Sequence, residues 1–351
     1  FIKFHLIKIY ESINMKNIII TGGLGFLGQY LVKGLLEKYP ESKIKILELR
    51  ENPNQLFDLR SDKRIQIKTE KDICNYDSIK SEFNEEDLVI HLAGLVSFWK
   101  GDKEKLYSVN CNGTDNIVKA CIEKKVGSLI HIGSVAAIGY HDNKESKINE
   151  NFEHDWKGAK KSKKHYMVTK YEGVKIVKKA SKDGLNTIIL HPGLMYGPGD
   201  VTNSSRLIKA IEEKRIPFNM PGGTNIVDVR DVSKGIIHAI EKGRYGECYL
   251  LSGHNITFKK QNKIIARYLG VSPPKVTLPK FMNPIFYWVF SLIESKKKKP
   301  ELTADNIDSA FKFRYFDNSK AESELSWSPK ISFEKTIEDT IKWMKTNEIK
   351  K

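Results

Sequence analysis

The sequence predicts an α/β fold in which a doubly wound parallel sheet is joined to a smaller, mainly helical C-terminal lobe. Short β-branched runs alternate with helical stretches up to residue 192, glycines follow the first run, and proline- and glycine-rich loops replace this alternation after residue 193. Strands of a parallel sheet are buried on both faces and therefore read as apolar runs, and the intervening helices cross back over the sheet. With 351 residues, 40% of them hydrophobic, the chain can bury the large core that this fold needs.

Six apolar runs are the candidate strands, and the first begins two residues after Met15. The stretches between them carry apolar residues three and four positions apart, which is the spacing of a helix face. A last strand returns near 248–251, and the tail from residue 258 is mainly helical. The candidate strands are 17–21, 43–48, 65–68, 88–92, 128–133 and 186–191, and the candidate helices include 30–38, 115–125 and 166–182.

A glycine-rich turn follows the first strand and leads into the first helix. Such a turn binds phosphate, because the free backbone amides and the dipole of the helix N-terminus favour an anion. A loop for nucleotide triphosphates needs Lys and Ser or Thr after its last glycine, whereas Gly28 is followed by Gln29 and Tyr30. The turn therefore predicts a dinucleotide site formed by Gly22, Gly25, Phe26, Leu27 and Gly28.

Glu48 and Arg50, near the end of the second strand, help to decide whether NAD or NADP binds. Glu48 lies about 20 positions beyond the glycines, where a carboxylate binds the ribose hydroxyls and repels a 2′-phosphate. Arg50 lies two positions later and would favour the 2′-phosphate instead. We predict NAD as the cofactor, with NADP as the alternative.

A tyrosine and a lysine four residues apart, Tyr166 and Lys170, share one face of a predicted helix. A nearby ammonium lowers the pKa of a phenol, so this pair suits proton transfer to or from a carbonyl oxygen. Ser134 follows the strand 128–133, and the carboxyl end of a parallel strand presents its residues to the site. Ser134 lacks the flanking glycine pattern of a serine hydrolase, so we expect it to orient the reacting oxygen.

Composition excludes several other classes of protein. The formal net charge is +16, but the lysines are spread along the chain without interleaved aromatic residues, so we expect no nucleic-acid partner. The lysine-rich run 160–164 is interpreted as a solvated loop, with steering of an anionic substrate as the alternative. Four cysteines without metal-ligand spacing predict no metal site and a reduced, cytoplasmic protein.

One apolar, aromatic run, 284–293, is half as long as the roughly 20 residues that span a bilayer. No transmembrane span is therefore expected. Lysines 296–299 follow the run, so a peripheral membrane contact through 284–299 stands beside a core or pocket helix as an open alternative. A homodimer is likewise left open.

Taken in order, the motifs resemble those of the extended short-chain dehydrogenase/reductase (NAD-dependent epimerase/dehydratase) family, from Met15 to the end of the chain. Gly22, Gly25 and Gly28 are three apart, as in that family, and residues 109–114 are similar to its VNxxGT segment. The segments 96–99 and 278–293 resemble its dihydroflavonol-reductase-like and 3β-hydroxysteroid-dehydrogenase-like branch. His191 stands where the family often has Arg.

This resemblance implies a Rossmann fold and a role for each matching residue. The catalytic residues would be Ser134, Tyr166 and Lys170, supported by Asn110, and Tyr166 and Lys170 would also contact the cofactor. The remaining cofactor contacts implied by the family are Asp72, Ile73, Leu92, Ala93, Gly94, Pro192, Gly193 and Leu194.

The expected function is hydride transfer between the nicotinamide and a secondary alcohol or ketone of an apolar ring substrate. A sugar-nucleotide epimerase or dehydratase would use the same three catalytic residues. A regulatory protein that binds NAD(P) without turnover is the alternative from another class, although it would have no use for them.

The domain organisation follows from these assignments. We expect an NAD(P)-binding domain over 15–192 with a return segment near 225–252, and a substrate-binding lobe from 193–224 and 253–351. Residues 1–14 are interpreted as an upstream extension, because Met15 lies just before the first strand. Lysines and a histidine interrupt their apolar positions, so we expect no secretory signal there.

Overall fold

Within the part of the chain that the structure describes, seven parallel strands form the main sheet, in the order β10-β6-β5-β4-β1-β2-β3. The computed structural model describes residues 16–53, 55–294 and 299–347, so the upstream extension expected over 1–14 lies outside them. The strands of this sheet are β1 (Asn17–Thr21), β2 (Lys43–Leu47), β3 (Ile65–Lys68), β4 (Leu88–His91), β5 (Ser128–Ile132), β6 (Thr187–Pro192) and β10 (Cys248–Leu251). This arrangement confirms the predicted doubly wound sheet.

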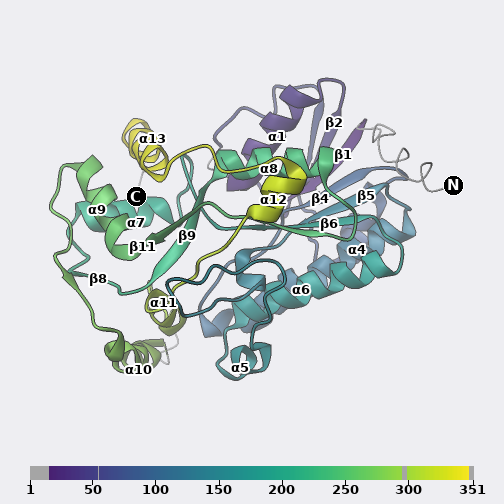
Figure 1. Ribbon diagram of the computed structural model, residues 1–351. Helices are drawn as coiled ribbons and strands as arrows, with labels where there is room; N and C mark the ends of the chain where they lie inside the picture. Colours follow the sequence, from purple (N-terminus) through teal and green to yellow (C-terminus); the bar gives the residue numbers. More distant parts are fainter. Residues whose placement is uncertain (1–15, 54, 295–298, 348–351) are drawn as a thin grey trace.

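Helices cover both faces of the sheet (Figure 1), and alternate strand residues pack against each layer. On one face Ile18 and Ile20 share a core cluster with residues of α1 and α8, and on the other Ile19 packs with residues of α4 and α6. The helices of these layers are α1 (Phe26–Lys38), α8 (Val229–Lys242), α4 (Thr114–Glu123) and α6 (His165–Lys182). Shorter elements beside them are α2 (Tyr76–Ile79), η1 (Lys80–Glu82), η2 (Lys100–Asp102), α3 (Lys103–Tyr107), η3 (Ser108–Gly113), η4 (Val135–Ala137) and α5 (Trp156–Lys161).

The direction of the chain across the sheet reverses between β1 and β4. From β1 the sheet extends to β2 and β3 on one side, and to β4, β5, β6 and β10 on the other. In open α/β sheets the ligand binds at the carboxyl ends of the strands beside such a reversal. The glycine turn after β1 and the loops after β4, β5 and β6 therefore converge on one crevice.

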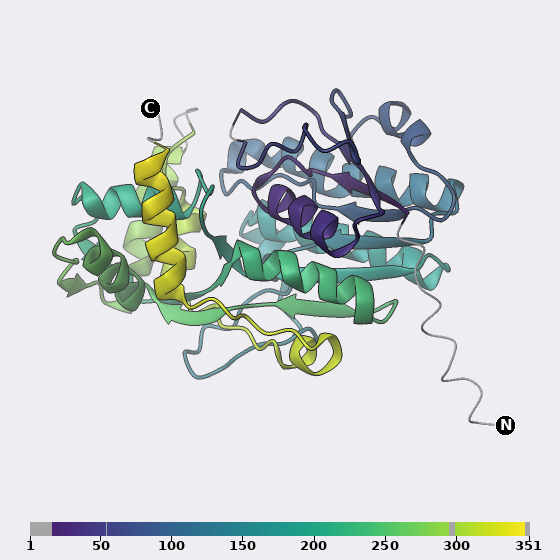
Figure 2. The ribbon, with the colours of Figure 1, turned by 90° about the horizontal axis from the view of Figure 1, so that it is seen from above.

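A second lobe lies beside the carboxyl edge of the sheet (Figure 2). It contains the three-stranded sheet β11-β9-β7 and the pair β12-β8, where the sequence indicated mainly loops. These strands escaped prediction because they lie among glycines and prolines, which are typical of loops. Its elements are β7 (Leu194–Tyr196), α7 (Ser204–Glu212), β8 (Phe218–Asn219), β9 (Gly223–Asp228), β11 (His254–Thr257), α9 (Phe258–Leu269), β12 (Val276–Thr277), η5 (Lys280–Met282), α10 (Asn283–Glu294), α11 (Ala304–Ala310) and α13 (Phe333–Thr346). The remaining helix, α12 (Ser319–Leu325), packs against α8 and β10.

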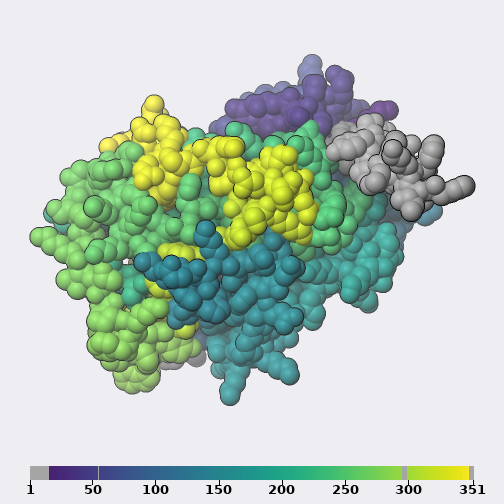
Figure 3. Space-filling model, in the orientation of Figure 1, coloured from purple at the N-terminus to yellow at the C-terminus, as the bar shows by residue number. Residues whose placement is uncertain are grey.

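The return segment 225–252 contributes to both parts of the molecule. β9 pairs with β7 and β11 in the small sheet, whereas β10 extends the main sheet beside β6. The C-terminal residues also join the two parts, and in Figure 3 they extend across the surface of both. Trp327, after α12, donates its indole N–H to the Asp231 carbonyl of α8 at 2.8 Å.

Candidate active site

The glycine turn is shaped by contacts that leave no room for side chains. Gly22 has a φ of +76°, and a Cβ there would lie 2.8 Å from the Ala93 nitrogen. A Cβ at Gly28 would lie 2.5 Å from the Gly22 carbonyl oxygen. Gly25, at the N-cap of α1, has no side-chain cap, and a Cβ there would meet only the Gly22 oxygen, at 3.1 Å. The turn is thus tight on its protein side and open above the first turn of α1, which fits a dinucleotide phosphate.

Glu48 lies beside this turn, as predicted from its spacing. Its carboxylate accepts a hydrogen bond from the Leu24 N–H at 2.8 Å. Burial raises the pKa of Glu48, and the bonds from the Leu24 and Leu49 N–H groups oppose the shift. Arg50 is exposed at the surface. Glu48 therefore anchors the turn at the position where a ribose carboxylate is expected.

The other residues assigned to the cofactor lie at or after the carboxyl ends of β3, β4 and β6. The Leu92 and Ala93 N–H groups donate to the Thr21 carbonyl and hydroxyl, so 92–94 runs alongside the glycine turn. Gly193, after β6, donates to the Leu251 carbonyl, with Pro192 and Leu194 on either side. Asp72 accepts from the Cys74 N–H at 2.9 Å, and Ile73 is buried against Gly113.

Ser134, Tyr166 and Lys170 come together at the ends of β5 and α6. The Ser134 hydroxyl is hydrogen-bonded to the Tyr166 phenol. Lys170 lies one turn further along α6, and its Nζ donates to the Ile132 carbonyl at 3.1 Å. The phenol and the ammonium are both almost buried, at 8% and 9% exposed. A hydroxyl, a phenol and an ammonium so arranged can hold a carbonyl oxygen and transfer its proton.

The cation that acts to lower the pKa of Tyr166 is not the one that the sequence predicted. Burial raises the pKa of Tyr166, and the groups that oppose the shift are Ser134 and the guanidinium of Arg314, a residue that the sequence did not single out. Burial lowers the pKa of Lys170 to about 8. The ammonium of Lys170, which was expected to lower the pKa of the phenol, is thus hydrogen-bonded to β5. The guanidinium of Arg314, from the second lobe, acts to lower the pKa of Tyr166 instead.

Asn110 connects the crevice to the catalytic helix. Its side-chain oxygen accepts from the Leu95 N–H at 2.8 Å, and its amide donates to the Leu95 carbonyl and to the Thr169 hydroxyl. Asn110 lies in η3, a π-helical segment between α3 and α4. This wider turn presents Asn110 to α6, as π-helical segments often do at functional sites.

His191, which stands where the resemblance led us to expect Arg, is fully buried at the end of β6. Its Nδ1 lies 3.0 Å from the Ser134 carbonyl oxygen, so this nitrogen carries the proton and donates. Burial lowers the pKa of His191 to about 3, which keeps the ring neutral. His191 therefore holds the backbone of Ser134 without adding charge to the site.

A group of charged residues on the lobe side of Tyr166 was missed by the sequence analysis. Lys164, placed in a solvated lysine loop, is in fact 8% exposed. Its Nζ lies 2.6 Å from Asp308 and 3.3 Å from Asp305, both on α11. Arg314 lies close by, and its Nε is buried without a hydrogen-bond partner in the described part of the chain. The one sequence feature that could have indicated this charged group is the position of Lys164, two residues before Tyr166.

The aromatic residues of segments 96–99 and 278–293 divide into two sets. Phe98 packs edge-on against the ring of Tyr166, with 5.1 Å between ring centroids. Phe286 packs inward on Phe218 and Phe311, whereas Trp288 on the same helix is 63% exposed. Phe98 is therefore the aromatic residue that adjoins the reacting groups.

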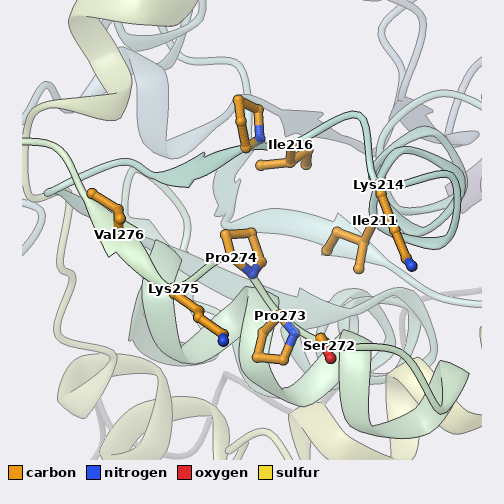
Figure 4. Close-up of a pocket in the computed structure, with 9 residues that line it drawn as sticks. Ile211, Lys214, Ile216, Ser272, Pro273, Pro274, Lys275 and Val276 are labelled. Carbon is orange, nitrogen blue, oxygen red and sulfur yellow. The ribbon is translucent and has the colours of Figure 1, made fainter.

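The cavity drawn in Figure 4 lies in the second lobe, away from these groups. It measures about 370 Å³ and is lined by proline rings and isoleucines, with Lys214 and Lys275 at its sides. It contains none of the residues predicted for the site. We therefore assign the reaction to the crevice.

Comparisons with known proteins show the family to which the chain belongs. The family model described as "3-beta hydroxysteroid dehydrogenase/isomerase family" matches residues 19–243. A 3beta-hydroxysteroid-dehydrogenase/decarboxylase of Arabidopsis thaliana is 28% identical over 353 residues, which cover 92% of this chain and 78% of that protein. A decarboxylating sterol-4-alpha-carboxylate 3-dehydrogenase of Schizosaccharomyces pombe is 24% identical over 346 residues, 94% of this chain and 98% of that protein.

A solved structure of similar fold is that of UDP-glucuronic acid 4-epimerase from Bacillus cereus in complex with UDP-glucuronic acid and NAD. It has a TM-score of 0.73 and 21% identity, and the match covers 94% of this chain and 99% of that one. This likeness establishes the shared fold. The family match extends over both the glycine turn and the segments that contain Ser134, Tyr166 and Lys170, and the chain belongs to the 3-beta hydroxysteroid dehydrogenase/isomerase family, a family of oxidoreductases.

Proposed function

We propose that the protein oxidises a secondary hydroxyl of an apolar ring substrate that carries a carboxylate on the adjacent carbon, with NAD as cofactor. The observation that carries this proposal is Arg314, a guanidinium with no ion pair among the described residues and close enough to Tyr166 to act on its pKa. A guanidinium whose Nε is buried without a hydrogen-bond partner among the described residues is costly and marks a site for an anion. The names of the two curated relatives, a decarboxylase and a carboxylate dehydrogenase, support a carboxylate.

The roles of the chain's residues follow from their positions. Ser134 donates to or accepts from the substrate oxygen, and Tyr166 accepts the hydroxyl proton as the carbonyl forms. Arg314 holds the carboxylate, and the Phe98 ring packs on the apolar ring system beside it. NAD supplies the hydride acceptor when bound, held by the Gly22–Gly28 turn and Glu48.

Oxidation leaves the carboxylate β to a ketone, an arrangement that loses CO₂ readily. The bond between the ring carbon and the carboxyl carbon breaks, and its electron pair passes to the ketone as an enolate. The proton that Tyr166 accepted is then available to the enolate oxygen. The atoms and charges of substrate and NAD thus balance as ketone, CO₂ and NADH.

The experiment compares three substrates with NAD: a 4α-carboxy-3β-hydroxysterol, the same sterol without the carboxylate, and UDP-glucuronic acid. For Arg314→Met we expect KM for the carboxylated sterol to rise about 100-fold, the effect of one charged bidentate contact. KM for the uncarboxylated sterol should change far less. The exposed Arg267→Met is the control for loss of one positive charge.

Three outcomes would contradict the proposal. If Arg314→Met raised KM equally for both sterols, Arg314 would not bind a carboxylate, and the proposed substrate would be wrong. Turnover of UDP-glucuronic acid alone would favour an epimerase. Binding of NAD without turnover of any of the three would favour the regulatory alternative.

We also infer that the outer face of α10 contacts a membrane surface. Ile285, Trp288 and Ile293 are 56%, 63% and 46% exposed on that face, and Phe281 before it is 77% exposed. Such an apolar, aromatic face, which lysines 296–299 follow in the sequence, suits an anionic lipid surface. Among the described residues no helix is long and apolar enough to cross a bilayer. Co-sedimentation with vesicles of phosphatidylcholine and phosphatidylserine measures the contact.

The homodimeric state and the cytoplasmic location of the protein stay predictions. The cysteines Cys74, Cys111, Cys121 and Cys248 are free, which is consistent with a reducing compartment. Light scattering in solution measures the oligomeric state.

A further inference from the structure

Lys164 joins the start of the catalytic helix to the second lobe. It occupies the N-cap of α6, two residues before Tyr166, and its ammonium bonds to Asp308 and Asp305, one turn apart on α11. Burial disfavours the charged form, but Asp305, Tyr140 and Asp308 outweigh it and raise the pKa of Lys164. Lys164 is therefore a charged ammonium held between two carboxylates.

The same two carboxylates act on Arg314. Burial lowers the pKa of Arg314, and Asp305, Tyr140 and Asp308 oppose the shift. A guanidinium matches carboxylates better than an ammonium does, because it donates two parallel hydrogen bonds. Yet Asp308 bonds to Lys164 and to the Asn283 amide at 2.9 Å, and Lys312 is 4.0 Å away. Asp308 is thus occupied by groups other than Arg314, whereas Asp305 forms an ion pair with Lys164 at 3.3 Å and its Oδ1 is buried without a hydrogen-bond partner in the described part of the chain.

We propose that Lys164 is a positioning residue that holds Asp305 and Asp308 and so keeps Arg314 free for the anionic group of the substrate. Without Lys164, the two carboxylates would turn to the nearby guanidinium and compete with the substrate for it. This inference rests on the proposed function, because it assumes that Arg314 binds the substrate carboxylate. It assigns to Lys164 a role in specificity that requires no contact with the substrate.

The test measures KM and kcat of variants on the two sterols used above. Lys164→Met should raise KM for the carboxylated sterol about tenfold, by the competition of a charged hydrogen bond, with a much smaller effect on the uncarboxylated sterol. Replacing both competitors as well, in Lys164→Met/Asp305→Asn/Asp308→Asn, should restore KM. Lys164→Arg should stay near the wild type. Lys160→Met removes a surface lysine paired with Glu172 and is the matched control.

A second design applies if Lys164→Met does not fold. Lys164→Gln/Asp308→Asn removes one buried charge of each sign and leaves Asp305 to compete for Arg314. A selective rise in KM is still expected, and adding Asp305→Asn should abolish it.

The outcomes separate this inference from the proposed function. A loss of kcat equal on both sterols, with KM unchanged and no recovery on removal of the aspartates, would show that Lys164 is only structural. If Arg314→Met is selective and Lys164→Met is not, this inference alone fails. If Arg314→Met is not selective, the proposed function fails.

Discussion

The cofactor side and the substrate side of Tyr166 are held in place by different kinds of contact. On the cofactor side, backbone groups of the main sheet bind the site residues: Lys170 bonds to the Ile132 carbonyl and His191 to that of Ser134. On the substrate side, charged side chains join elements far apart in the chain. Lys164 and Asp308 are 144 residues apart.

This difference indicates how strongly the geometry of each side depends on single substitutions. A site built on strand ends keeps its geometry as long as the sheet folds, so the cofactor side serves any substrate. A site built on ion pairs between the sheet domain and the lobe changes with single substitutions. Substrate choice is therefore expected to lie in the lobe.

Tyr166→Phe tests whether both sides serve one proton transfer, and it should have the largest effect. We expect kcat to fall about 1,000-fold, because a general acid-base group is removed, while NAD binding is retained. Steady-state rates and NAD fluorescence titration measure the two quantities. Tyr171→Phe, on the same helix and stacked on Trp156, is the control. Full activity in Tyr166→Phe would overturn the assigned role.

Two glycine variants separate the structure of the cofactor side from its binding function. Gly28→Ala should lower the free energy of unfolding by about 3 kcal/mol, because the new methyl would overlap the Gly22 carbonyl. Gly25→Ala meets little protein and should leave stability within about 1 kcal/mol, yet weaken NAD binding about 100-fold by blocking phosphate approach. Denaturant unfolding and calorimetric titration measure these effects. Equal behaviour of the two variants would argue against the phosphate site.

Lys170→Met should make the protein inactive but more stable, by about 2 kcal/mol at pH 7. The pKa of Lys170 is lowered from 10.5 to about 8. Between these values the unfolded chain binds the proton that the folded protein has lost, so the free energy of unfolding rises with pH, by about 3 kcal/mol in all. Lys170→Met removes this dependence of the free energy of unfolding on pH, and it also removes the hydrogen bond to the Ile132 carbonyl. Urea unfolding between pH 7 and 10 measures it, with the exposed Lys178→Met as control; an unchanged slope would contradict the burial of a charge.

The parts of the fold that follow local patterns could be predicted. β1 to β6 were foreseen from β-branched runs. The catalytic roles of Ser134, Tyr166 and Lys170, inferred from spacing and from resemblance to a family, stay predictions. The small sheet was missed because its strands lie among glycines and prolines. Arg314 and Lys164 were missed because their roles depend on charges brought together by tertiary packing.

The π-helical segment Ser108–Gly113 sets a limit on how this chain can vary by insertion and deletion. Loss of any one of its six residues would let α3 and α4 merge into a regular helix, which is the more stable backbone. The merged helix would turn the side chain at position 110 by about 100° relative to the helix that follows. Asn110 would then lose Leu95 and Thr169 together, so a one-residue deletion here should be less tolerated than most substitutions in the same segment.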